Sequence, residues 1–211
     1  MNQLLLAVPA FGLTTLLLVM VPGQGVAMVL RQSILGGSRS ALLSAIGNCA
    51  GILVWAASSA VGLSAIFAKS HTAYNLLKWA GVIFLVVVSI QTLFTLKNEF
   101  GKFDLDSKSD MGSLASFRLG LITNLTNVKA AVYAVAFLPA FVPQDFSLGI
   151  GIFFFGCVWA IVSISWNIFL IWTVKVSAHY IQRPIVRRVL TAISAIGIMC
   201  LAIGLALSSG R

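Results

Sequence analysis

Six long apolar stretches constrain this chain more than any other feature of its sequence. Each approaches or exceeds the roughly 20 apolar residues that a helix needs to cross a bilayer. Their continuous apolarity excludes the alternating pattern of a membrane β-barrel. We therefore predict an all-α integral membrane protein with six transmembrane helices. The stretches are Leu4–Leu30, Ala41–Ala68, Trp79–Leu96, Leu119–Val142, Leu148–Val174 and Val189–Leu207.

The composition excludes a water-soluble domain. Hydrophobic residues make up 59% of the chain and charged residues 9%, whereas a soluble domain carries about 25% charge. The net charge of +9 would suggest nucleic-acid binding in a soluble protein. Here the basic residues lie in short loops between apolar stretches. We therefore expect the lipid bilayer as surroundings and no nucleic-acid partner.

Basic residues predict the orientation in the membrane. The first, third and fifth loops share one side and hold ten Lys and Arg residues, whereas the other side holds three. Cytoplasmic loops carry the excess of such residues. We therefore expect both termini outside and the long loop 97–118 in the cytoplasm.

The loop 97–118 also divides the chain into two halves, 1–96 and 119–211, with three predicted spans in each. A half with an odd number of spans must return in inverted orientation if it is repeated, as in many secondary transporters. We therefore expect two inverted three-helix repeats.

The segment Pro22-Gly23-Gln24-Gly25 interrupts the first span. Proline removes a backbone donor, and glycine permits backbone angles closed to other residues. Broken backbone at membrane depth is tolerated only where it is buried in protein or lines a cavity. We predict that Pro22, Gly23 and Gln24 bind substrate; a simple proline kink is the alternative.

The fourth span contains Asn124, Asn127 and Lys129 close together. A charged residue near the centre of a membrane helix costs about 2.5 to 3.5 kcal/mol. Lys129 could bond to free carbonyl groups of a neighbouring broken helix, or it could hold an anionic group. We predict that all three residues bind substrate.

These two motifs lie at about the same depth, one in each half of the chain. Matching interruptions in two halves are the best pointer in a sequence to a transport site. We therefore expect the Pro22–Gly25 break and Asn127–Lys129 to face one another across a central cavity.

Other spans offer weaker candidates. Gly47 and Gly51 form a small-xxx-small pattern that favours close helix packing, and Asn48 between them is a further predicted substrate-binding residue. Trp159, Trp166 and Asn167 could wall a pocket or simply supply bulk.

The sequence contains almost no residue pattern that is typical of an enzyme active site. It has no His, Cys, Asp and Glu cluster with metal-ligand spacing, no nucleophile triad within the spans and no phosphate-binding glycine loop. We expect no enzyme, no metal and no cofactor.

Several short motifs, in this order and at these spacings, resemble the LysE/RhtB family of bacterial amino-acid exporters over nearly the whole chain. The motifs are Pro22-Gly23, Gly36-Gly37 to Gly47 and Gly51, Leu77-Lys78-Trp79-Ala80-Gly81, Phe117-Arg118-x-Gly120, Asn127-x-Lys129-Ala130, Leu138-Pro139-x-Phe141-Val142 and Arg187-Arg188.

The chain departs from the pattern of that family at three positions. Gly25 stands where the family typically has the Asp of PGPD, and Ile52 follows Gly51 where members often have Asp. Val128 replaces the proline of NPKA. Both intramembrane carboxylates are therefore absent, while Lys129 remains.

The resemblance implies a multi-pass protein of the bacterial cytoplasmic (inner) membrane, and the distribution of basic residues predicts that both termini are periplasmic. We expect it to export a small neutral amino acid or related metabolite by alternating access, with a homodimer as one oligomeric state to test. The alternative is a degenerate member that no longer transports and serves as an accessory membrane subunit. A metal-ion exporter is disfavoured because hard cations need oxygen-rich anionic sites.

Overall fold

The computed structural model describes residues 2–20, 23–67, 111–143 and 145–181, together with isolated residues between 76 and 94 and between 185 and 207. Every element within the four continuous ranges is helical. The prediction of an all-α fold is confirmed for this part of the chain.

Three of the described helices are long and apolar enough to cross a membrane. They are α1 (Asn2–Met20), α3 (Gly37–Phe67) and α7 (Leu148–Ile181). A fourth candidate is a bent pair, in which α5 (Ser113–Leu125) meets the segment Val128–Phe141 at 58°. The predicted spans Trp79–Leu96 and Val189–Leu207 lie outside the continuously described residues.

The first predicted span consists of two helices. α1 ends at Met20, and α2 (Gln24–Leu35) begins after Gly23. The predicted interruption of this span is therefore confirmed, although Pro22 itself lies outside the described residues.

The fourth span begins earlier than predicted, at Ser113 instead of Leu119. The prediction was wrong because it followed apolarity, whereas the first turns of α5 use polar contacts. Ser116 is fully buried, and its hydroxyl lies 2.7 Å from that of Ser40 in α3.

Beyond the bend, the fourth span continues as three short pieces. These are α6 (Val128–Val132), the π-helical turn η1 (Tyr133–Phe137) and the 3-10 turn η2 (Leu138–Phe141). Pro139 sits at the start of η2, where the missing amide of proline removes no intrahelical bond.

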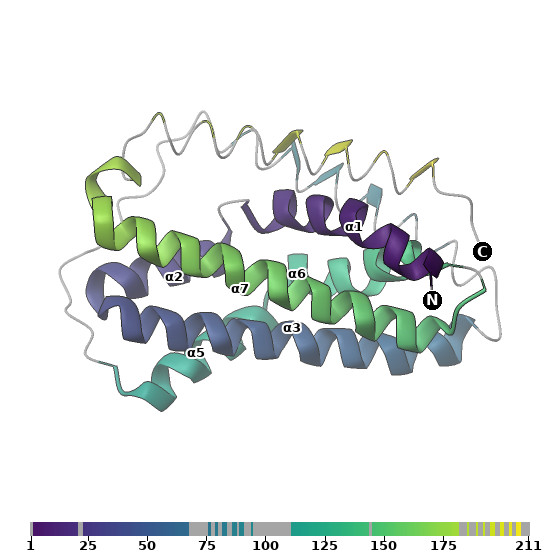
Figure 1. Ribbon diagram of the computed structural model, residues 1–211, viewed down its shortest axis with the longest axis horizontal. Helices are drawn as coiled ribbons and strands as arrows, with labels where there is room; N and C mark the ends of the chain where they lie inside the picture. The colour runs from purple at the N-terminus through teal and green to yellow at the C-terminus, as the bar shows by residue number, and fades with distance from the viewer. Residues whose placement is uncertain are drawn as a thin grey trace.

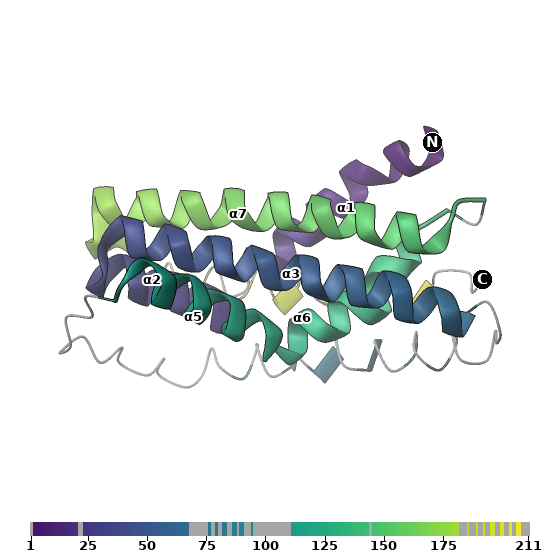
Figure 2. The ribbon, with the colours of Figure 1, turned by 90° about the horizontal axis from the view of Figure 1, so that it is seen from below.

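Helix α3 is the centre of the arrangement and contacts α2, α5 and α7. α3 and α7 run side by side along the molecule, and α1 leaves this pair at an angle (Figures 1 and 2). α5 packs closely on α3 because both have glycine at the crossing. A Cβ added at Gly47 would overlap the carbonyl oxygen of Phe117, and one at Gly120 would overlap that of Ser44. The close packing predicted from the glycine pattern is confirmed.

An aromatic cluster joins α1 to the second half of the chain. The ring of Phe11 contacts the rings of Tyr133 and Phe155, with the Phe11 and Phe155 centroids 4.7 Å apart, and Tyr133 in turn contacts Trp159. The hydroxyl oxygens of Thr15 and Tyr133 lie 2.7 Å apart, and both side chains are buried. This cluster fixes the end of α1 against η1 and α7.

Large apolar side chains cover much of the outer surface. Leu6 is 78% exposed, Ile161 63% and Trp172 57%. A soluble monomer rarely exposes large contiguous apolar patches, so these side chains suit contact with lipid and support the membrane assignment. Among the isolated described residues, the Ser89 hydroxyl donates to the Ala195 carbonyl at 2.8 Å, which joins the third predicted span to the sixth.

Candidate substrate site

The breaks in the first and fourth spans meet at one cavity of about 50 Å³. α2, α3, α5 and α7 each contribute to its wall, together with the end of α1 and the start of α6. Its lining includes Leu18, Gly23, Gly25, Asn48, Ile52, Asn124, Asn127, Lys129, Trp159, Ser163 and Asn167.

The structure brings most of the predicted site residues to this cavity. Gly23, Asn48, Asn124, Asn127 and Lys129 line it. Substrate binding by them stays a prediction, because their position does not test it. Of the remaining two, Gln24 lines a different cavity, and Pro22 lies outside the described residues.

At the first break, the backbone of α2 begins without a side-chain cap. Gly23 is the N-cap with extended backbone angles, and the first intrahelical bond runs from the Ala27 amide to the Gly23 carbonyl at 2.9 Å. The amides at the start of a helix have no intrahelical partner and carry partial positive charge. Gly23 and Gly25 present this positive end of α2 to the cavity.

At the second break, the chain caps itself. The Asn127 side chain accepts a hydrogen bond from the Lys129 amide at 3.0 Å, which makes Asn127 the N-cap of α6. Asparagine is among the preferred residues for this position. The Asn127 cap thus gives the bend a local cause, although position 128 is valine and not proline.

Lys129 connects the two breaks. Its Nζ atom donates a long hydrogen bond of 3.4 Å to the carbonyl oxygen of Leu18, in the last turn of α1, where carbonyl groups lack intrahelical partners. The prediction that Lys129 could bond to a free carbonyl group of a neighbouring broken helix is therefore confirmed by this hydrogen bond. The same side chain also lines the cavity, so this bond leaves a role toward a ligand open.

Asn124 brings a polar group to the cavity without a partner. Its side chain is 3% exposed, and its Oδ1 atom accepts no hydrogen bond from any described residue. Gly51 makes its position feasible, since a Cβ added there would lie 2.6 Å from the Asn124 Cβ. A buried acceptor left unpaired costs about 1 to 3 kcal/mol.

One face of α7 completes the wall. Trp159, Ser163 and Asn167 follow one another at intervals of four residues and are 3%, 4% and 6% exposed. Sequence reading missed Ser163 and left Trp159 and Asn167 undecided, although their helical spacing was the available signal. Trp166 is not among the lining residues of this cavity.

Lys129 is the charged residue among these lining residues, and the others are neutral. Asp145 is the single carboxylate within the described residues, and it lies in the turn that precedes α7. The cavity therefore combines a positive charge with uncharged polar groups.

Comparison with known sequences assigns the chain to a family of transport proteins. The sequence model of the LysE type translocators matches residues 16–209. The chain belongs to this family. The resemblance inferred from the motifs is thereby confirmed, and the family is one of transport proteins.

Relatives of this LysE-type chain include efflux proteins. It is 33% identical to the homoserine/homoserine lactone efflux protein of Salmonella typhimurium over 138 residues, 64% of this chain and 65% of that protein. It is 25% identical to the leucine efflux protein of Salmonella choleraesuis over 165 residues, 78% of this chain and 77% of that protein. The membrane protein YrhP of Bacillus subtilis is 21% identical over 203 residues, 93% of this chain and 94% of that protein. No solved structure matches the chain at a significant level.

Within this LysE-type chain, two of the three departures from the family pattern fall at the cavity, whereas Val128 does not line it. Gly25, which replaces the typical acid, lines it, and Ile52 does so as well. A Cβ at Gly25 would lie 3.4 Å from the Asn48 amide nitrogen, which is ordinary van der Waals contact. Two positions at which the resemblance predicts carboxylates therefore lie at the cavity.

Proposed function

We propose that this LysE family protein exports a small neutral amino acid, or a related metabolite, across the bacterial cytoplasmic membrane. The observation that carries the proposal is the meeting of two broken helices at one cavity with Lys129. Efflux of homoserine and of leucine by relatives supports a substrate of this size and class.

The positively charged groups and the neutral acceptors of the cavity suit the carboxylate and the ammonium of an amino acid. The substrate carboxylate would pair with Lys129 and with the free amides at the start of α2, an arrangement typical of anion sites. The substrate ammonium would donate to neutral acceptors, of which Asn124 Oδ1 is buried and unpartnered within the described residues.

A basic amino acid would suit the cavity poorly. Its second positive charge would find no carboxylate among the described lining residues. At about 6 Å from Lys129 and an effective dielectric near 20, repulsion costs roughly 3 kcal/mol. We therefore expect a neutral, small or aliphatic side chain on the substrate.

Alternating access fits the dimensions of the site. The cavity of about 50 Å³ is smaller than the roughly 300 to 1,000 Å³ of small-molecule pockets, so its walls must move to admit an amino acid. The breaks beside Gly23 and Asn127 are natural hinges. We propose that they move within two inverted three-helix repeats, residues 1–96 and 119–211, with six spans in all, periplasmic termini and the loop 97–118 in the cytoplasm.

Efflux from loaded cells tests this proposal. Cells that overproduce the protein and control cells with empty vector would be loaded with labelled leucine, threonine, homoserine, lysine and arginine. We expect accelerated loss of at least one neutral amino acid, and lysine and arginine at least tenfold slower. Equal efflux of the basic amino acids would contradict the charge argument.

The alternative is an accessory membrane subunit that does not transport. Family membership and the efflux relatives favour transport over this alternative. If the protein were well expressed in the membrane and moved no amino acid, the accessory role would replace the proposal. A homodimer stays a prediction under either function.

A further inference from the structure

A second cavity, of about 350 Å³, lies between one face of α2 and one face of α5. α2 contributes Gln24, Met28, Arg31 and Gln32, and α5 with its following turn contributes Leu119, Thr123 and Thr126. This cavity has the volume of a small-molecule pocket, whereas the central cavity does not. Nothing in the function proposed above uses it.

The two cavities share their walls. Gly23 and Gly25 line the central cavity, and Gln24 between them lines the second one. The same alternation holds at the end of α5 and in the turn that follows it, where Asn124 and Asn127 line the central cavity but Thr123 and Thr126 line the second. Successive residues of a helix point about 100° apart, so a single thickness of backbone separates the two spaces.

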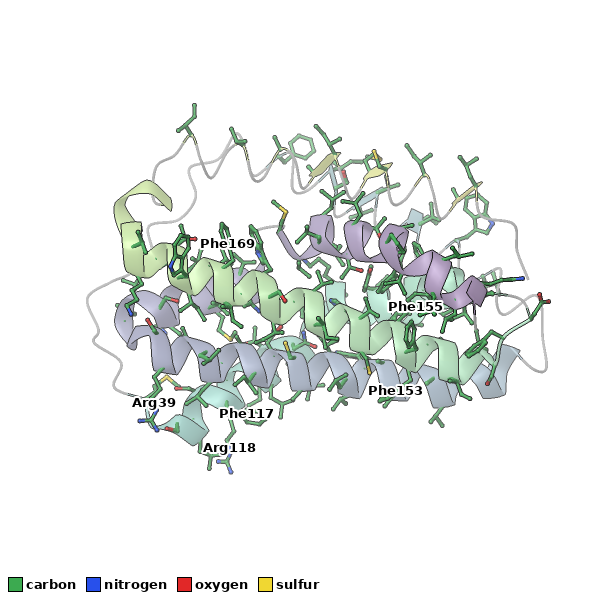
Figure 3. The ribbon with its side chains drawn as sticks, viewed as in Figure 1. Arg39, Phe117, Arg118, Phe153, Phe155 and Phe169 are labelled. Atoms are coloured by element: carbon green, nitrogen blue, oxygen red, sulfur yellow. The ribbon has the colours of Figure 1, made fainter. Side chains whose placement is uncertain are left out.

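Arg31 gives the second cavity a charge. The guanidinium is a planar donor that matches a carboxylate in a bidentate pair. The one carboxylate among the described residues is Asp145. It lies in the turn just before the first residue of α7 and does not line this cavity. Two other arginines lie toward the same end of the molecule: Arg39 in the first turn of α3 and Arg118 in the middle of α5 (Figure 3).

The end of the second cavity near Gln32 is fixed by a buried hydrogen-bond network. Gln32 is fully buried and accepts a bond of 2.8 Å from the Ser40 hydroxyl, which in turn lies 2.7 Å from that of Ser116. This network ties α2, α3 and α5 together. Movement of the shared wall is therefore easier at its other end, near Gln24 and Thr126, where both breaks lie.

We propose that the second cavity is an outlying docking site for the substrate carboxylate, with Arg31 as its recognition residue. This inference rests on the function proposed above. The substrate binds first to Arg31, beside the Thr123 hydroxyl and the Gln24 amide. The substrate then passes the wall between Gln24 and Thr126, and its carboxylate leaves Arg31 and pairs with Lys129.

Charged thiol reagents test the docking site without requiring transport. Thr123→Cys would be introduced into protein whose native cysteines Cys49, Cys157 and Cys200 are replaced by alanine. A negatively charged sulfonatoethyl methanethiosulfonate should label this cysteine faster than its positively charged trimethylammonium counterpart. In the Arg31→Gln variant, we expect the ratio of the two rates to fall about tenfold, as for steering by a local charge.

Arg39→Gln is the matched control, because it removes the same charge from the first turn of α3, and Arg39 does not line the cavity. We expect it to leave the labelling ratio unchanged. Equal ratios in the Arg31→Gln and Arg39→Gln proteins would overturn the inference. Thr126→Cys serves as a second reporter if Thr123→Cys fails to fold.

Transport kinetics in vesicles give a second readout with leucine or homoserine as the probe. Arg31→Gln should raise the half-saturating concentration about tenfold, the effect of losing a charge-assisted hydrogen bond, and change the maximal rate less than twofold. A lower maximal rate with unchanged half-saturation would contradict the docking role.

The two tests separate the inference from the proposed function. Arg31-dependent labelling in a protein that moves no amino acid would support the anion site and reject the exporter. Robust neutral amino-acid efflux with labelling that is independent of Arg31 would do the reverse.

Discussion

The breaks in the first and fourth spans leave different backbone groups unpaired. At the fourth-span break, Asn127 caps the following helix through the Lys129 amide. At the first-span break, Gly23 offers no side chain to the start of α2, and the Leu18 carbonyl before the break receives the Lys129 ammonium. One break is closed by its own residues, while the other depends on a residue from the opposite half.

This difference assigns separate tasks to the two breaks. The capped break has a defined local geometry and projects Lys129 toward α1. The uncapped break keeps amides available at the cavity, where a carboxylate could take them together with Lys129. Lys129 is then shared between the Leu18 carbonyl and the substrate, so binding at one break alters the contact that holds the other.

Replacement of Lys129 should break this relationship most severely. In Lys129→Ala, the first break loses its partner and the substrate loses its cation, so we expect neutral amino-acid efflux to fall about 100-fold. Initial efflux rates at equal expression measure it. Lys175→Ala, at an exposed lysine of α7, should retain full activity; a comparable loss there would show that removal of any lysine impairs the protein.

A carboxylate restored at the first break should change the substrate preference. In Gly25→Asp, the cavity gains a negative charge near the Asn48 amide, and we expect the ratio of neutral to basic amino-acid efflux to fall about tenfold. Gly25→Asn has nearly the same shape without the charge and should keep the wild-type ratio. If both variants behave alike, space and not charge determines the preference.

Removal of the cap should make the fourth-span break resemble the first. Loss of an asparagine N-cap costs about 1 kcal/mol, and in Asn127→Ala we expect efflux to fall about fivefold as Lys129 loses its fixed position. Asn127→Ser keeps a capping oxygen and should recover most of the rate. Equal rates for the alanine and serine variants would argue against a capping role.

The Thr15–Tyr133 contact should affect stability more than transport. In Tyr133→Phe, the buried Thr15 hydroxyl loses its 2.7 Å partner, and thermal unfolding in detergent should show a loss of about 1 to 2 kcal/mol. The double variant Thr15→Val and Tyr133→Phe leaves no orphaned hydroxyl and should be less destabilised than the sum of the single variants. We expect efflux to change less than twofold, because neither residue lines the cavity.

Much of this arrangement could be predicted from local sequence. Gly23 disrupts a helix by its own backbone preferences, and a lysine at membrane depth must have a partner, so Lys129 signalled a site by itself. Apolar length located α1, α3 and α7 but not the start of α5. These features depend on residues close together in the chain.

The rest depends on tertiary packing. Gln24 lines the second cavity because of its position on the first turn of α2. Its residue type alone does not reveal which cavity it faces. Ser163 was hidden in a continuously apolar span. Its buried place at the central cavity, and not its residue type, distinguishes it from Ser165, whose hydroxyl bonds back to Ile161 within α7. The early start of α5 depends on the buried partner of Ser116 in another helix.

Recognition of the substrate carboxylate by Lys129 is the central claim, and competition by leucine and leucinamide tests it most directly. Both compounds have the same ammonium and side chain, but leucinamide lacks the carboxylate. In membrane vesicles that contain the wild-type protein, leucine should inhibit transport of the labelled neutral substrate about 100-fold more effectively than leucinamide. In Lys129→Gln vesicles, measured by binding if transport is too slow, this preference should shrink to less than about fivefold. An unchanged preference in Lys129→Gln would contradict the account, because the carboxylate would then be recognised elsewhere.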